Sequence, residues 1–275
     1  MIQSRKKKKF RDTDIKPAKG VYILPNALTL CGMFLGFYAI IAAINGNLIH
    51  SAWAIVLANI FDGLDGWVAR LTRTATRFGG ELDSLSDIVA FGIAPSILIY
   101  KWGLYDFGRI GFAIAFLFAA CGALRLARFN IQTGTIKSFK GLPIPGAATM
   151  IAATVIFCHE ILNIAPEKNL FFPVITLILS FMMVSNIKFH GLKEVDFKEK
   201  KPFWLLIFFI LLLFLIIIHP HIAVFILACI YVLSGIIETV IIFIKKRKKL
   251  AKKLSEGENQ KTLNTEVYDE KNKNI

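Results

Sequence analysis

Four carboxylates stand close together within an otherwise apolar part of the chain. Residues 61–87 read FDGLDGWVARLTRTATRFGGELDSLSD, and the aspartates are Asp62, Asp65, Asp83 and Asp87. Asp62 and Asp65 are three residues apart, and Asp83 and Asp87 are four apart, so each pair shares one face of a helix. An aspartate near the centre of a membrane helix costs about 2.5–3.5 kcal/mol on insertion scales. Four of them in such a setting must therefore be compensated by a partner.

Converging carboxylates are a typical site for a hard divalent cation such as Mg²⁺ or Mn²⁺. The linker LTRTATRF (71–78) is short enough to make the two helices antiparallel neighbours, so that the two aspartate pairs face each other. Magnesium sites commonly take substrate phosphates as further ligands. The sequence therefore predicts a metal site that acts on a phosphorylated substrate.

The residues between the aspartates fit a phosphate site. Gly63, Gly66 and Ala69 remove side-chain bulk, which allows a ligand or a neighbouring backbone to approach. Arg70 follows, and a guanidinium can bind a phosphate through two parallel hydrogen bonds. Asp62 and Arg70 are roughly 12 Å apart along a helix axis, a depth that a lipid phosphate can reach. Taken singly, each feature has another explanation: helix pairing for an aspartate, close packing for the glycines, and membrane topology for the arginine.

Long apolar segments must hold this stretch in place. The chain has 275 residues, of which 55% are hydrophobic and 24 are Phe, more than a soluble domain of this size needs. Apolar runs of about 20 residues predict membrane-spanning helices. Charged residues interrupt the second and third runs, so six to eight helices are defensible. We predict an all-α, polytopic transmembrane bundle of about eight helices, at 26–44, 49–70, 80–100, 108–128, 144–163, 170–187, 203–219 and 222–244.

Basic residues indicate the orientation of these helices. They gather in the N-terminal arm, in alternate connections and at the start of the tail, which places both termini in the cytoplasm. The net charge of +14 fits this topology and attraction to anionic lipids, and no basic run carries the aromatic spacing of a nucleic-acid site. We divide the chain into a basic arm (1–20), a six-helix core (21–190), a C-terminal helix pair (191–244) and a disordered tail (245–275).

The spacing of the motif resembles a known signature. The pattern D-x-x-D-G-x-x-A-R-(x8)-G-x-x-x-D-x-x-x-D resembles that of the CDP-alcohol phosphatidyltransferase family, without departure at any fixed position. PNALT at 25–29 also resembles the start of the family's first helix. The resemblance implies a core of about six helices in the inner cell membrane, an active site open to the cytoplasm, and a homodimer.

Site residues follow from the same resemblance. It implies that Asp62, Asp65, Asp83 and Asp87 hold two divalent metal ions, Mg or Mn, and that Asp87 is the general base for an acceptor alcohol. It further implies that the residues binding CDP-diacylglycerol are Asn26, Thr29, Gly66, Ala69, Arg70 and Gly79.

The acceptor alcohol is less well defined by the motif. The stretches LDSLSD, CGALRLARFNI and FKGLPIPGAA resemble the branch of the family that uses L-serine. A serine carboxylate needs a cationic partner, and the candidate serine-binding residues are Arg125, Arg128, Asn130 and Lys140. Glycerol 3-phosphate or an inositol phosphate would attract the same cations, so charge alone leaves the acceptor open.

Two other classes of membrane protein also use buried carboxylates. Intramembrane prenyltransferases bind a metal-bridged diphosphate with two aspartate clusters, but those clusters lie far apart in sequence. An ion-coupled transporter explains buried aspartates, but it does not explain Arg70 and the neighbouring glycines. Both remain alternatives to the phosphatidyl transfer.

Overall fold

The structure is a computed structural model that describes residues 23–72, 74, 76–132, 141–164, 166, 168–185, 218–235 and 237. Every regular element within these ranges is helical, as the sequence predicts. The arm at 1–20, most of the expected helix at 203–219, the end of the expected helix at 222–244 and the tail at 245–275 lie outside the described residues.

The helices begin and end close to the predicted apolar runs. Among the described residues, three helical stretches are long and apolar enough to cross a membrane: Ile23–Ile44, Leu48–Leu71 and Arg77–Ile131. The last of these contains a reversal, so that α5 runs back along the segment that precedes it. The bounds are α1 Ile23–Ile44, α2 Leu48–Leu71, α3 Arg77–Asp87, α4 Ala94–Ile99, α5 Gly108–Gln132, α6 Ile144–Glu160 and α7 Phe171–Val184, with a further helix at Pro220–Gly235.

The predicted helix at 80–100 differs from expectation. It is not one regular α-helix, because π-helical turns at Ile88–Ile93 (η1) and Tyr100–Leu104 (η2) interrupt it, and a 3-10 turn at Tyr105–Phe107 (η3) ends it. Each π turn has one more residue in its hydrogen-bonded loop than an α-helical turn has. Such turns often mark functional sites. The first π turn begins directly after Asp87, so the carboxylate face of α3 and the core face of α4 need not keep one continuous helical register.

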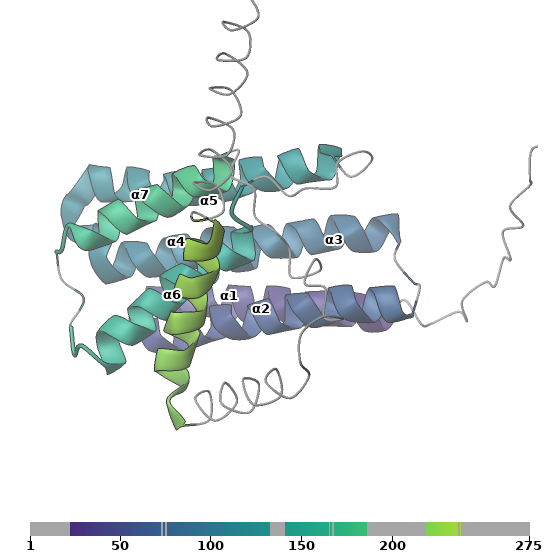
Figure 1. The fold of residues 1–275 in the computed structure, drawn as a ribbon, viewed down its shortest axis with the longest axis horizontal. Coiled ribbons are helices and arrows are strands. Elements are labelled where there is room, and N and C mark those ends of the chain that lie inside the picture. The colour runs from purple at the N-terminus through teal and green to yellow at the C-terminus, as the bar shows by residue number, and fades with distance from the viewer. Residues whose placement is uncertain are drawn as a thin grey trace, which may run out of the picture.

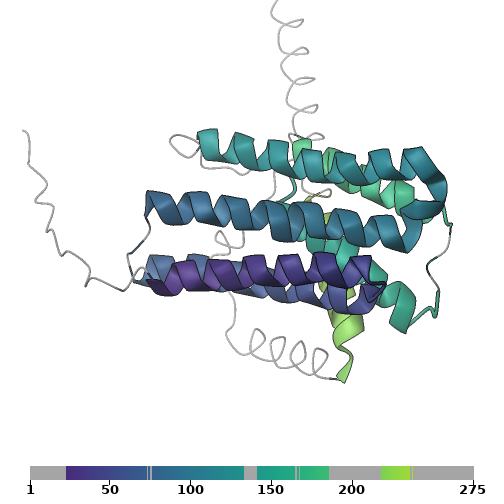
Figure 2. The same cartoon turned by 180° about the vertical axis from the view of Figure 1, so that it is seen from behind.

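The helices form three layers (Figures 1 and 2). The pair α1 and α2 makes one layer, the segment from α3 to α4 makes the middle one, and α5 and α7 make the third. The helix α6 packs against α2 and the first π turn. We call the end of the bundle where α2 ends and α3 begins the Arg70 end, since it holds the metal and phosphate motif.

Small residues allow α1 to lie directly on the middle layer. A methyl group built at Gly36 would come within 2.5 Å of Cα and 2.9 Å of the main-chain nitrogen of Ala90. Ala39, Ala43 and Ala90 are fully buried in the same core. Close contact between small residues is a usual source of stability for helices in lipid.

Large apolar side chains lie on the outside of the bundle. Phe34 and Phe37 of α1 and Phe112 and Phe116 of α5 are each more than half exposed. In water such a surface would be unfavourable, whereas a membrane helix can direct it toward acyl chains. Length, composition and exposure together describe a membrane helix bundle.

The last described helix, Pro220–Gly235, runs across the bundle instead of along it (yellow-green in Figure 1). Phe225 stacks on Phe157 of α6 with ring centroids 4.3 Å apart and an interplanar angle of 12°. Ala228 and Val232 are buried against the common core. This helix is therefore packed firmly against α6.

Candidate metal and phosphate site

Threonines shape the short connection between α2 and α3. The hydroxyl of Thr72 donates to the main-chain oxygen of Val68 at 2.8 Å and lies 2.6 Å from the hydroxyl of Thr74. Thr76 is the N-cap of α3, and its hydroxyl accepts a hydrogen bond of 3.0 Å from the amide of Gly79. These bonds satisfy polar groups that helix ends leave free. They let a connection of a few residues reverse the chain. The predicted close packing of α3 on α2 is wrong, because α3 packs mainly on α1.

Three of the four aspartates meet between α2 and α3. Carboxylate oxygens of Asp62, Asp83 and Asp87 all lie within 4.8 Å of one another, and each side chain is half-buried. Three hard oxygen donors so close together, in a weakly solvated setting, fit a divalent cation of the Mg²⁺ type. This is the grouping that the helical spacing predicts for these three residues.

Asp65 lies beside this cluster and is the most buried of the four aspartates, at 6% exposure. It interacts electrostatically with Asp62 and with Asp83. Together with Asp83 it lines a pocket between α1, α2 and α3. Asp83 therefore belongs to both the carboxylate cluster and the pocket, and the two sites share a boundary.

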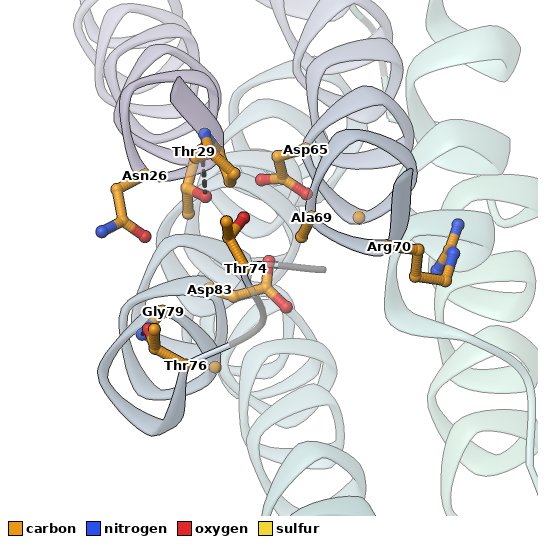
Figure 3. Close-up of a pocket in the computed structure, with 12 residues that line it drawn as sticks. Asn26, Thr29, Asp65, Ala69, Arg70, Thr74, Thr76, Gly79 and Asp83 are labelled. Carbon is orange, nitrogen blue, oxygen red and sulfur yellow. Dashed lines mark hydrogen bonds between the residues drawn. The ribbon is translucent and has the colours of Figure 1, made fainter. Parts of the chain in front are cut away.

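The pocket has a volume of about 250 Å³ and lies at the Arg70 end of the bundle (Figure 3). Its surface is mostly apolar, with a few polar and charged side chains, as is usual for small-molecule sites. All six residues assigned to CDP-diacylglycerol contribute to its wall. The lining residues are Pro25, Asn26, Thr29, Asp65, Gly66, Ala69, Arg70, Thr74, Thr76, Gly79, Gly80 and Asp83.

Two glycines of the pocket wall have no side chain, and this lets polar side chains approach the wall closely. A methyl group at Gly79 would lie 3.1 Å from Oδ1 of Asn26 and 3.2 Å from Oγ1 of Thr76. A methyl group at Gly66 would lie 3.5 Å from Nη1 of Arg70, so the guanidinium folds back over its own helix and is exposed on one side of the pocket (Figure 3). Gly79 thus leaves room for a side chain of α1 beside α3.

Ser86 connects the cluster with α1. It lies between Asp83 and Asp87 in the sequence, is buried, and donates a hydrogen bond of 3.1 Å from Oγ to the main-chain oxygen of Thr29. The hydroxyl of Thr29 donates in turn to the main-chain oxygen of Pro25 at 3.1 Å. The sequence alone indicates no role for Ser86, because this hydrogen bond depends on the packing of α1 on α3.

The four predicted acceptor residues have different surroundings. Arg125 of α5 is half-buried and interacts electrostatically with Asp87 and with Tyr231. Nη1 of Arg128 donates to the main-chain oxygen of Val184 at the end of α7, at 3.5 Å. Nδ2 of Asn130 donates to Oγ of Ser84 at 3.0 Å. Lys140 lies outside the described residues. Arg125 therefore interacts with the carboxylate cluster through Asp87.

A family comparison covers most of the described bundle. The model of the family described as CDP-alcohol phosphatidyltransferase matches residues 22–185. This range includes α1 to α7 and ends before the helix at Pro220–Gly235.

Individual relatives extend the similarity over most of the chain. The chain is 38% identical over 231 residues to the CDP-diacylglycerol-serine O-phosphatidyltransferase of Helicobacter pylori (strain J99), covering 83% of this chain and 96% of the relative. It is 37% identical over 219 residues to the protein of the same name from Methanocaldococcus jannaschii, covering 79% and 94%. It is 39% identical over 168 residues to an archaetidylserine synthase of Methanothermobacter thermautotrophicus, covering 60% and 69%.

Proposed function

The chain belongs to the CDP-alcohol phosphatidyltransferase family, and from that premise we propose that it transfers the phosphatidyl group of CDP-diacylglycerol to the hydroxyl of L-serine. The products are phosphatidylserine and CMP. The observation that carries the proposal is the shared boundary at Asp83 between the carboxylate cluster and the pocket at the Arg70 end. A donor whose diphosphate occupies this boundary would contact both.

The donor would bind at the Arg70 end of the bundle. Asn26, Thr29, Gly66, Ala69 and Gly79 line the pocket for its CDP part. Arg70 supplies a guanidinium beside it, suited to a phosphate oxygen.

A pair of divalent cations, Mg or Mn, would be held by the four aspartates. Asp62, Asp83 and Asp87 offer oxygens within 4.8 Å of one another, and Asp65 is adjacent. When bound, such cations neutralise charge on the diphosphate and on the leaving group.

Asp87 is the proposed general base. It takes the proton of the serine hydroxyl as the serine oxygen forms a bond to the phosphorus that carries diacylglycerol. The bond between that phosphorus and the bridging oxygen breaks, and the oxygen leaves with CMP. Asp87 is suited to this role because it lies in the cluster and interacts electrostatically with Arg125, a cation that can hold an acceptor carboxylate nearby.

Serine is favoured as the acceptor by the names of the relatives. Those similar to most of the chain are named as serine transferases. Arg125 is the proposed carboxylate partner, with Arg128, Asn130 and Lys140 as further members of the acceptor region. Glycerol 3-phosphate or an inositol phosphate is the second candidate, since either is also an anion that Arg125 could attract.

The membrane setting follows from the fold and the charge pattern. The helix bundle has the length and composition to cross a membrane. We place it in the inner cell membrane with the Arg70 end toward the cytoplasm, because basic residues gather in the arm and loops on that side. The homodimer rests on the family resemblance alone.

The test is an activity measurement on the purified protein in detergent. CDP-diacylglycerol and Mg²⁺ or Mn²⁺ are supplied, and CMP release is measured with L-serine, glycerol 3-phosphate or inositol phosphate in separate reactions. Release with serine only, together with formation of phosphatidylserine, is expected. Release only with a different alcohol would show that serine is not the acceptor, while the phosphatidyl transfer itself would be supported. No release with any alcohol would favour a binding or transport role.

A further inference from the structure

We infer that Tyr231, in the helix at Pro220–Gly235, is a positioning residue for Arg125, and that this helix completes the acceptor side of the site. The inference rests on the proposed function and adds to it a part of the chain that lies beyond the family match at 22–185. It concerns the recognition of an anionic acceptor, not the binding of the nucleotide.

The ring of Tyr231 lies directly on the backbone of α6. A methyl group built at Gly146 would come within 2.5 Å of Cε1 and 3.1 Å of Cδ1 of that ring. Gly146 is the last glycine of the stretch GLPIPG, whose first residues dock on α7 through a hydrogen bond of 3.1 Å from the amide of Leu142 to the main-chain oxygen of Met182. The position of the ring is therefore set by the start of α6.

The helix that carries Tyr231 is held along its length. Phe225 stacks on Phe157, while Ala228 and Val232 are buried in the common core. Tyr231 itself is half-buried and packs against that core. Its ring is consequently held in place against α6.

Arg125 interacts electrostatically with the carboxylate cluster and with the last described helix. Its two interacting groups are Tyr231, in the helix at Pro220–Gly235, and Asp87, at the end of α3. Within the described ranges, its Nε is buried and has no hydrogen-bond partner. A guanidinium has only donors, and a buried donor without a partner is unfavourable, so an acceptor anion that satisfies Nε would be bound more tightly.

Tyr231 can direct the guanidinium in two ways. Its ring is fixed by the close approach to Gly146, so the phenol cannot move away from Arg125 in the direction of α6. Its hydroxyl can accept a hydrogen bond from the guanidinium, which would leave other N–H groups directed toward the acceptor near Asp87. The ligand class is a small alcohol that carries a carboxylate or another anionic group close to its hydroxyl.

The decisive variant is Tyr231→Phe, which keeps the ring on Gly146 and removes only the hydroxyl. We expect the KM for the acceptor to rise about tenfold, the loss typical of a hydrogen bond to a charged group. The KM for CDP-diacylglycerol and the Mn²⁺ concentration for half-maximal activity should remain unchanged. Phe225→Leu is the matched control, because it weakens the packing of the same helix six residues away from Tyr231.

Three outcomes decide the inference. A rise in acceptor KM in Tyr231→Phe, with Phe225→Leu close to wild type, supports it. A wild-type acceptor KM in Tyr231→Phe overturns it, as does an equal change of all kinetic constants in both variants, since that would indicate a role in helix packing only. If the wild-type protein uses an acceptor other than serine, the proposed acceptor fails, and the same comparison made with that acceptor tests Tyr231 independently.

Discussion

Ser86 donates a hydrogen bond of 3.1 Å to the main-chain oxygen of Thr29, and this bond joins the middle layer to α1 at the site itself. Ser86 is flanked by Asp83 and Asp87, whereas Thr29 lines the pocket. One buried contact therefore sets the depth of the pocket relative to the carboxylate cluster. Both halves of the site depend on it, although neither residue has to touch the reacting atoms for this effect.

Replacing Ser86 by Ala should lower activity, because α3 loses its hydrogen bond to α1 and is held less firmly in place. We expect a several-fold loss of kcat/KM for CDP-diacylglycerol and a loss of about 1 kcal/mol in stability, the usual contribution of a buried hydrogen bond. Thermal unfolding in detergent and initial rates measure the two effects. The control is Ser96→Ala, because the hydroxyl of Ser96 bonds at 2.7 Å to Gly92 within the same helical segment. Equal losses of activity in both variants would contradict a specific role for the contact with α1.

Asp87→Asn should abolish turnover while it largely preserves donor binding. The amide keeps the shape of the side chain but cannot accept the acceptor proton, and general-base catalysis typically contributes 10²–10⁴ in rate. CMP release gives the rate, and binding of CDP-diacylglycerol is measured separately by thermal stabilisation. Glu81→Gln is the matched control, since it makes the same chemical change at an exposed residue of α3. Near-normal turnover in a folded Asp87→Asn protein would exclude Asp87 as the base.

Removal of divalent cations should abolish activity, and this effect should depend on Asp62 of the carboxylate cluster. A chelator should stop CMP release, and added Mn²⁺ or Mg²⁺ should restore it, because the donor diphosphate and the aspartates would otherwise repel each other. In the wild type, Mn²⁺ alone should also raise the melting temperature by preferential binding to the folded state. Asp62→Asn should reduce this shift, and Asp106→Asn, at the opposite end of the bundle, should retain it. A full shift in Asp62→Asn would remove Asp62 from the metal site.

The sequence contains enough information to predict the cluster but not its surroundings. Helical spacing and one short linker bring Asp62 to Asp83 and Asp87, since local geometry decides which side chains share a face. Apolar length alone likewise predicts the helices of the bundle. Both predictions depend on residues that are near one another in the chain.

The features that the sequence does not predict are one local change of main-chain hydrogen bonding and several contacts between distant segments. The π turn after Asp87 is a shift of main-chain hydrogen bonds, and no residue type in this stretch predicts it. The bond from Ser86 to Thr29 spans 57 residues. The contact of Tyr231 with Gly146 joins a helix near the end of the chain to the start of α6. Such contacts become visible only when the layers are packed together.

Gly79→Ala should weaken the binding of CDP-diacylglycerol. Its new methyl group would lie 3.1 Å from Oδ1 of Asn26 and 3.2 Å from Oγ1 of Thr76, so Asn26 must shift or α1 must move away from α3. Overpacking of this kind costs about 1–3 kcal/mol, and we therefore expect the KM for the donor to rise about tenfold, with little change in the KM for the acceptor.

The control for this variant is Gly63→Ala. Gly63 is an exposed helical glycine of α2, and a methyl group there meets nothing within 4 Å. Alanine favours a helix over glycine by about 0.5–1 kcal/mol at both positions, so this benefit cancels in the comparison. If the donor KM rises equally in both variants, or in neither, the close approach of Asn26 to α3 does not shape the nucleotide pocket, and the CDP part of the donor must bind elsewhere.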